Sequence, residues 1–275
     1  MSGPANAATP ELAATILLLR DGDAGLEVFM MVRHADVSAF AGAAVFPGGK
    51  VDPGDGEAAL RAHCDGGEAL SEAELALCIA AIREAFEECG ILFARAEGDA
   101  DIIASRPLQR IEAGWRQRLA DDDATMLELC RAERLRLGVD LLVPFAHWIT
   151  PRTQPRVFDT HFFLAAAPAH QRAHHDGREN SDSLWVRPAE AVAEADAGRR
   201  AVVFPTRMNL LKLARAKNTA EALGLARARP VVTVQPEASP HPDGRILRIP
   251  EAAGYDGNAF IVGPGGVGVR PLIED

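Results

Sequence analysis

The feature that most constrains this chain is a short acidic segment within a helical stretch, Arg83–Ile91. Its glutamates Glu84, Glu87 and Glu88 are spaced i, i+3 and i+4, so on a helix their carboxylates share one face. Positions 80 and 81, where a lysine would relieve Glu84, are both alanine, and only Arg83 stands four residues before Glu87. Like charges at this spacing cost a helix about 0.2–0.5 kcal/mol per pair. The segment therefore predicts a helix whose acidic face gains from an external cation.

The residues before this segment predict where the helix begins and what it buries. Ser71 followed by Glu74 is a capping-box pattern, and Gly90 falls where the helix can end. An apolar stripe with helical spacing runs through Leu75, Ile79, Ile82, Phe86 and Cys89. The glutamates lie opposite this stripe, and taken alone that arrangement favours a solvated face over a metal site.

A glycine-rich turn earlier in the chain, 47–56, changes that interpretation. Its glycines and prolines permit tight backbone geometry and expose carbonyl and N–H groups, as a loop beside a metal or phosphate requires. The turn can supply the Gly48 carbonyl and the Asp55 carboxylate. Together with the three glutamates these hard oxygens suit Mg²⁺ or Mn²⁺ and not a thiolate metal. Such an ion can neutralise a diphosphate and position a water for attack on phosphorus.

Charge and composition exclude several classes of partner. A net charge of −10 and a pI near 5.3 argue against sequence-independent binding to nucleic acid or to an anionic membrane. The single tyrosine argues against an aromatic base-stacking surface. The four cysteines form no C-x-x-C pair and no cluster of zinc spacing, which indicates structural thiols. The N-terminus lacks a signal-peptide pattern and no apolar run has the length of a membrane span, so we expect a cytoplasmic protein.

The rest of the chain predicts a sheet that starts early and is followed by helices. Two strand-like runs, 14–20 and 26–33, flank a hairpin turn at 21–25. The aspartates at 121–123 interrupt a helical region and are typical of a turn and helix cap rather than a metal site. The further expected elements are strands over 43–46, 141–149, 156–167, 184–187, 231–235 and 245–249, a helical region over 99–137, and helices over 188–197 and from an N-cap at Thr206 towards 223.

At the turn and the acidic segment the chain resembles the Nudix hydrolases, whose signature is G-x5-E-x7-R-E-U-x-E-E-x-G-U with U a bulky apolar residue. The first half is matched by Gly49 and, after five intervening residues, by Asp55 where the pattern has Glu. Twenty-seven residues separate Asp55 from Arg83 where the signature has seven, so about twenty are inserted. The second half is matched by Arg83, Glu84, Ala85, Glu87, Glu88, Gly90 and Ile91.

Such an interrupted signature occurs in one branch of the family, which resembles the mammalian peroxisomal coenzyme A diphosphatases. This chain is therefore similar to that branch. Two further segments add to this resemblance, 147–151 and 156–163. Nudix proteins often also carry a Glu shortly before a W-V-x-P strand, matched here by Glu179 ahead of 185–188. Together the matches span roughly residues 12–215.

The resemblance implies an α/β protein, an α/β/α sandwich with a mixed sheet and the acidic helix packed against it. The expected layout is a flexible tail over 1–10, a Nudix domain over 11–225 with insertions at 56–75 and 99–138, and a C-terminal extension over 226–275 packed on the domain.

Carried over by position, the resemblance also implies roles in the site. Glu87, Glu88 and the Gly48 carbonyl would hold metal, with Glu84 as ligand or general base. Arg83 would orient the glutamates through charge-assisted hydrogen bonds. Glu179 is a second candidate for the base or an additional ligand. The candidates for substrate contact are Gly49, Asp55, Arg33, Arg152 and Arg156.

The implied activity is cleavage of a nucleoside diphosphate linked to another moiety. Coenzyme A or an acyl-CoA is the leading substrate, giving 3′,5′-ADP and (acyl-)4′-phosphopantetheine. Two alternatives stay open: a pyrophosphatase for ADP-ribose, NADH or a nucleotide sugar, and a Nudix-fold nucleotide-binding or regulatory protein without catalysis, which Asp55 and the stretched loop motivate. From position alone, we expect residues 99–138 to cap the acyl or pantetheine end and the tail from 226 to close a homodimer.

Histidines outside the signature favour structural roles. His147 and His161 each sit in a strand-like apolar run, where a hydrogen-bonded structural histidine is more common than a catalytic one. Asp159 either ties two strands together or contacts substrate. The histidines of the polar loop 170–177 are typical of a solvated loop rather than of a metal site.

Overall fold

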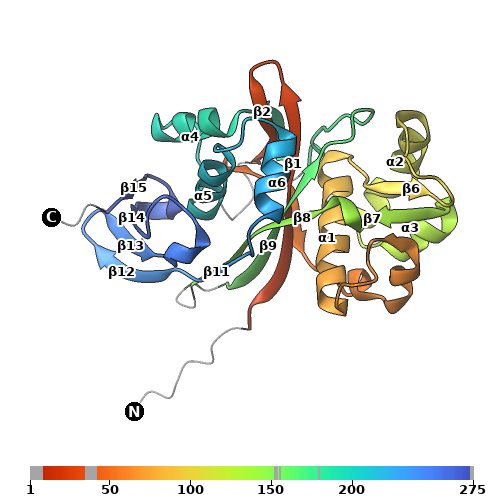
Figure 1. Cartoon of the computed structure of the whole chain (residues 1–275), viewed down its shortest axis with the longest axis horizontal. Helices are drawn as coiled ribbons and strands as arrows, with labels where there is room; N and C mark the ends of the chain where they lie inside the picture. Colours follow the sequence, from red (N-terminus) through yellow and green to blue (C-terminus); the bar gives the residue numbers. More distant parts are fainter. Residues whose placement is uncertain (1–8, 35–41, 152–153, 155, 179, 273–275) are drawn as a thin grey trace, which may run out of the picture.

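The computed structural model describes residues 9–34, 42–151, 154, 156–178 and 180–272. Its centre is an eight-stranded mixed sheet with helices on both faces (Figure 1). The predicted α/β/α sandwich is therefore confirmed. No helix among the residues so described is both long enough and apolar enough to cross a bilayer.

The central sheet is built around a hairpin and a parallel partner. Strand β1 (Glu11–Gly22) pairs antiparallel with β2 (Gly25–Arg33) and parallel with β9 (Phe158–Ala166). The order along the sheet is β10-β2-β1-β9-β8-β11, while β3 and β4 pair with β2 and β1. The remaining strands of this sheet are β3 (Ala44–Val45), β4 (Gly48–Lys50), β8 (Val143–Ile149), β10 (Asn180–Val186) and β11 (Thr233–Val234). The predicted strands, including the early hairpin, are confirmed with shifted ends.

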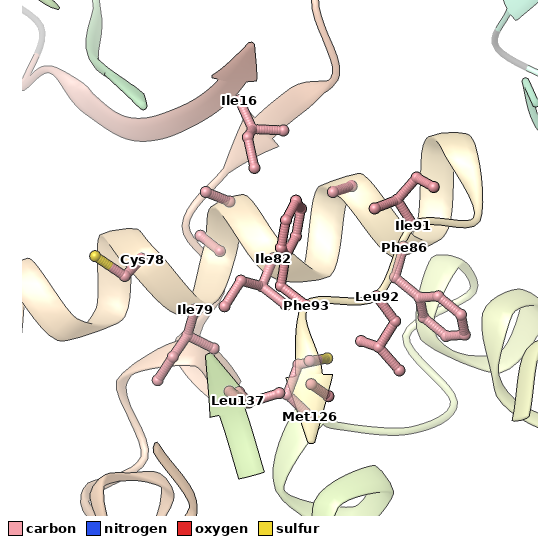
Figure 2. Close-up of a cluster of buried hydrophobic side chains, with 14 of the residues drawn as sticks. Ile16, Cys78, Ile79, Ile82, Phe86, Ile91, Leu92, Phe93, Met126 and Leu137 are labelled. Atoms are coloured by element: carbon pink, nitrogen blue, oxygen red, sulfur yellow. The ribbon is translucent and has the colours of Figure 1, made fainter. Parts of the chain in front are cut away.

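Helix α1 (Glu72–Cys89) covers one face of this sheet. Ser71 and Glu74 form the predicted capping box, and Gly90 ends the helix in the left-handed conformation, with φ at 72°. Buried residues of α1 share one core cluster with alternate residues of β1, such as Ile16. Figure 2 shows Ile16 on one side of the helix and Ile79, with Leu137 and Met126, on the other. Fully burying side chains of this size stabilises the fold by about 1.5–3 kcal/mol each. This packing fixes the position of the acidic segment.

Three helices cover the opposite face, α4 (Pro188–Asp196), α5 (Phe204–Leu213) and α6 (Thr219–Arg227). The intervening residues of β1, such as Leu17, point into their core. The prediction of one helix capped by Thr206 is wrong. Val203 is the N-cap and Thr206 is buried inside α5, because a proline in the first turn already has helical φ. A new helix then starts at Asn218, whose side chain accepts from the Glu221 N–H.

The two inserted stretches meet in a small three-stranded sheet beside α1. Strand β7 (Leu135–Gly138) pairs with β5 (Cys64–Asp65) from the first insertion and with β6 (Ala94–Ala96). Helices α2 (Ser105–Ala120) and α3 (Met126–Glu133) complete this unit. The predicted turn at the aspartates is confirmed, with Asp121 as the C-cap of α2. The prediction that the helical region reaches 137 is wrong, because strand pairing across the insertions overrides local helical preference.

The C-terminal residues add a four-stranded antiparallel sheet, which lies beyond α5 in Figure 1. Tyr255 joins it to the main fold, since its hydroxyl donates to Asn209 of α5 at 2.8 Å and accepts from Trp148 of β8 at 2.9 Å. The strands are β12 (Glu237–His241), β13 (Gly244–Arg248), β14 (Ala259–Val262) and β15 (Val269–Pro271). Short 3₁₀ turns occur at η1 (Pro53–Gly56), η2 (Ala58–His63), η3 (Val139–Leu141), η4 (Glu251–Ala253) and η5 (Pro264–Gly266).

Candidate active site

The buried side chain of Arg83 is the centre of the candidate site, where α1 meets β4 and η1. Its Nε donates to Asp55 Oδ1 at 3.0 Å, and its Nη1 donates to Glu84 Oε1 at 2.9 Å. The same Nη1 also reaches both Glu87 oxygens at 3.3 Å. Nη2 donates to the Lys50 carbonyl at 2.8 Å. One guanidinium therefore orients the carboxylates of three different residues and anchors them to the glycine-rich turn.

The turn fits closely against these carboxylates. The Gly48 N–H donates to Glu88 Oε2 at 2.7 Å. A Cβ at Gly49 would lie 2.4 Å from Glu84 Oε1, and one at Gly48 would lie 2.5 Å from the Ala14 carbonyl oxygen. Position 48 therefore requires glycine for the turn to approach β1 this closely, and a side chain at position 49 would displace the Glu84 carboxylate. From the sequence we predicted that the Gly48 carbonyl would bind a metal ion. The Gly48 contact described above is made by the N–H group instead, with Glu88 as its acceptor.

The acidic face is buried, so the interpretation of it as a solvated face is wrong. Glu84 and Glu88 are each 9% exposed and Asp55 is 2% exposed, because η1 and β4 cover the helix there. Burial raises the pKa of the Glu84 carboxyl to about 8 and that of Glu87 to about 7, although Arg83 lowers both. Burial also raises the pKa of Asp55. Burial opposes the charge on Arg83, yet the carboxylates around it outweigh this effect and raise its pKa.

These carboxyl groups fit a divalent ion of the Mg²⁺ or Mn²⁺ kind. Burial, and to a lesser extent the neighbouring carboxylates, disfavours their ionised forms, and the positive charge of an ion would offset both effects. Their donors are hard oxygens, the type that such ions prefer. The glycine at position 49 also lets the Glu84 carboxylate lie against the turn, where a Cβ would overlap it.

We predict that the metal-free protein loses stability as the pH rises from about 5 to about 8. The carboxyls of Glu84 and Glu87 have folded-state pKa values of about 8 and about 7, against 4.5 as the ordinary value. The folded state then binds more protons than the unfolded chain in this range, so the free energy of unfolding falls with pH, by up to about 1.4 kcal/mol per unit for each carboxyl. Urea titrations in a chelating buffer measure this slope, and excess Mn²⁺ should flatten it. A metal-free stability that is flat or rises over this range contradicts the prediction.

The remaining predicted site residues stand on other elements or outside the described residues. Arg33 ends β2, and Arg156 lies in an exposed bend before β9. Glu179 and Arg152 lie outside the described residues.

The Asp55 side chain is 1% exposed and held by Arg83, so in this structure it is not open to a substrate. Its shorter side chain still reaches Arg83 because η1 brings it close to α1.

The structure also brings together three residues that the sequence left unconnected, His147, Asp159 and His161. Part of this arrangement could have been predicted from the sequence. Asp159 and His161 are two residues apart, and side chains alternate along a strand, so the two share a face of β9. What the sequence did not show was the β8–β9 register that sets His147 opposite His161.

Comparison with known proteins agrees with the fold. A family model described as the NUDT19 Nudix domain matches residues 59–212, which is more than half of the chain and includes the acidic helix. The chain therefore belongs to the Nudix family. Within that family, the matching model is the one for the NUDT19 type of Nudix domain.

Individual relatives show the same similarity. The acyl-coenzyme A diphosphatase NUDT19 of Gallus gallus is 34% identical over 137 residues, covering 43% of this chain and 35% of that protein. A putative nudix hydrolase 7 of Caenorhabditis elegans is 28% identical over 199 residues, covering 70% of this chain and 57% of that protein. The matched region thus spans between about a third and somewhat over half of these relatives. The crystal structure of a NUDIX hydrolase from Alicyclobacillus acidocaldarius superposes with a TM-score of 0.69 at 27% identity, covering 79% of this chain and 96% of that one.

Proposed function

We propose that this protein is a divalent-metal-dependent diphosphatase that hydrolyses coenzyme A or an acyl-CoA to 3′,5′-ADP and (acyl-)4′-phosphopantetheine. The observation that carries the proposal is the buried group of carboxyls around Arg83, closed on one side by the glycine turn. The similarity to proteins named acyl-coenzyme A diphosphatase supports the choice of substrate.

We propose the following roles for the residues of this cluster. Glu87 and Glu88, with the Gly48 carbonyl, would hold Mg²⁺ or Mn²⁺, and Glu84 would act as a ligand or as the general base. When bound, such an ion offsets the charge of the diphosphate and favours ionisation of the attacking water. Arg83 holds Glu84 and Glu87 in place through the hydrogen bonds from its Nη1. We assign Asp55 a positioning role, since its carboxylate contacts Arg83 from the buried side.

Parallel kinetics on four diphosphates test the substrate proposal. We expect kcat/KM for coenzyme A and acetyl-CoA to exceed that for ADP-ribose and NADH by about ten-fold or more, which corresponds to about 1.4 kcal/mol of transition-state binding. The reactions should need added Mg²⁺ or Mn²⁺ and should stop with a chelator. Cleavage of ADP-ribose without turnover of coenzyme A would overturn the substrate assignment but leave the diphosphatase class standing.

A further inference from the structure

A second group of metal-type donors lies on the α1 face of the central sheet. His147 comes from β8, and Asp159 and His161 come from β9. His147 Nε2 lies 2.5 Å from Asp159 Oδ1, and His161 Nε2 lies 3.5 Å from the same oxygen. One donor atom from each of the three residues lies within 4.8 Å of the others. The three side chains therefore converge on one small volume.

The register of the sheet produces this convergence. His147 is the direct partner of His161 in the antiparallel β8–β9 pair, and their rings stack with centroids 4.0 Å apart and an interplanar angle of 22°. Phe163, two residues after His161, packs in the core on the α1 side, which places the group on that face. The backbone, rather than a chance rotamer, thus holds the two imidazoles side by side.

This group is separate from the carboxyls around Arg83. His161 and Gly49 are both register partners of Ala14, from opposite sides of β1. Since neighbouring strands are about 4.8 Å apart, the backbones of these two residues are roughly 10 Å apart. An ion bound by the histidines would therefore occupy a site of its own.

The chemistry of the donors selects a different kind of ion. Two imidazoles and one carboxylate suit Zn²⁺ and similar first-row transition ions better than Mg²⁺. Ligand atoms about 2.1 Å from a tetrahedral ion are about 3.4 Å from each other, and the two histidine–Asp159 separations, 2.5 and 3.5 Å, are close to this value. Binding requires the stacked imidazole rings to rotate so that both Nε2 lone pairs face the ion. His147 Nδ1 is hydrogen-bonded to Thr233 Oγ1 at 2.8 Å, which leaves Nε2 as the ring nitrogen that faces the other donors.

The site is also open to solvent. The side chains of His147, Asp159 and His161 are 16%, 23% and 31% exposed. Three protein donors with solvent access are the pattern of a zinc site that keeps an open coordination position, whereas structural zinc sites are closed by four protein ligands.

We propose that His147, Asp159 and His161 form a transition-metal site of the Zn²⁺ class, with an open coordination position, distinct from the carboxylate site on α1. The ion links β8 to β9, and through Thr233 it also braces the start of the C-terminal extension at β11. This inference does not depend on the diphosphatase proposal.

Calorimetric titration of the metal-free full chain with Zn²⁺ tests the site. We expect one Zn²⁺ per chain to bind, with the affinity lowered by about a hundred-fold or more in His147→Ala, Asp159→Asn and His161→Ala, and by about ten-fold in Thr233→Val. His63→Ala, which removes a half-buried histidine on η2 outside this group, is the matched control and should bind as the wild type does. Glu88→Gln should also leave Zn²⁺ binding intact.

Co²⁺ titration of the wild type gives a readout that does not depend on the variants folding. Intense visible absorption, displaced by Zn²⁺, is expected for four or five ligands including two imidazoles. Weak absorption typical of six oxygen ligands overturns the proposal, as does Zn²⁺ affinity that survives His161→Ala in a chain shown by circular dichroism to be folded. In that case the His147–Asp159 contact is a structural hydrogen bond only.

Discussion

Glu88→Gln should lower kcat/KM for diphosphate hydrolysis by about 10³-fold or more while the chain stays folded. The substitution keeps the shape of the side chain, and an amide oxygen can still accept from the Gly48 N–H, which Glu88 Oε2 contacts at 2.7 Å. It removes the negative charge that a hard divalent ion prefers, and the transition-state stabilisation that depends on such an ion is worth several kcal/mol. Initial rates at saturating Mn²⁺, with Mn²⁺ affinity measured separately, show whether the loss comes from metal binding.

The matched control is Glu72→Gln, the same chemical change at an exposed position in the first turn of α1. Its kcat/KM should stay within about two-fold of the wild type, since it lies more than four turns from Glu88 along the helix. If Glu88→Gln retains activity within ten-fold of an active wild type, Glu88 does not hold the required ion.

Arg83→Met should lower the free energy of unfolding of the metal-free protein by about 3–5 kcal/mol near pH 8, the range found when one partner of a buried ion pair is removed. Arg83 is 6% exposed and is the guanidinium that neutralises Asp55, Glu84 and Glu87. Methionine keeps much of the side-chain volume, so the loss reports uncompensated charge rather than a cavity. Urea unfolding with a chelator present measures this loss in the free energy of unfolding.

This destabilisation should depend on pH in a predictable direction. The pKa values of Glu84 and Glu87 are already raised by burial, and without Arg83 they rise further, so both carboxyls are neutral near pH 5. The cost of Arg83→Met should therefore shrink as the pH falls from about 8 to about 5. Arg110→Met, which breaks an ion pair to Glu133 through an arginine that is 72% exposed, should cost less than about 1 kcal/mol at either pH. Equal costs for the two variants would mean that Arg83 does not offset the buried charge.

Local signals in the sequence were sufficient for the element that carries the site. The caps at Ser71 and Gly90 act within a few residues of themselves, so the ends of α1 could be read before any tertiary contact was known. The run Leu26–Arg33 likewise carried enough strand character to predict β2.

Features made by distant contacts could not be predicted in this way. The sequence of β7 alone predicts the end of a helix. It forms a strand because β5 and β6 pair with it. The spacing of the acidic residues in α1 predicts a solvated face. The spacing contains no information about η1 and β4, which cover these residues in the fold. The meeting of His147 with Asp159 and His161 depends on the register of two strands joined by a loop, which the composition of neither strand specifies.

The same limit applies to Asp55. Asp55 is one methylene shorter than the Glu of the signature. From the sequence alone, this difference suggested a site without catalysis. In the fold, η1 moves the backbone close enough for Asp55 to accept from both Nε and Nη2 of Arg83, each at 3.0 Å. The inserted residues after it form η2 and β5 and leave that contact in place.

Mass spectrometry of the products formed from coenzyme A by the full chain with Mn²⁺ or Mg²⁺ is the decisive test of the proposed diphosphatase activity. We expect 3′,5′-ADP and 4′-phosphopantetheine in equal amounts, both absent with a chelator and both lost in Glu88→Gln. Coenzyme A and acetyl-CoA that remain intact, while the protein is folded and binds Mn²⁺, would contradict it.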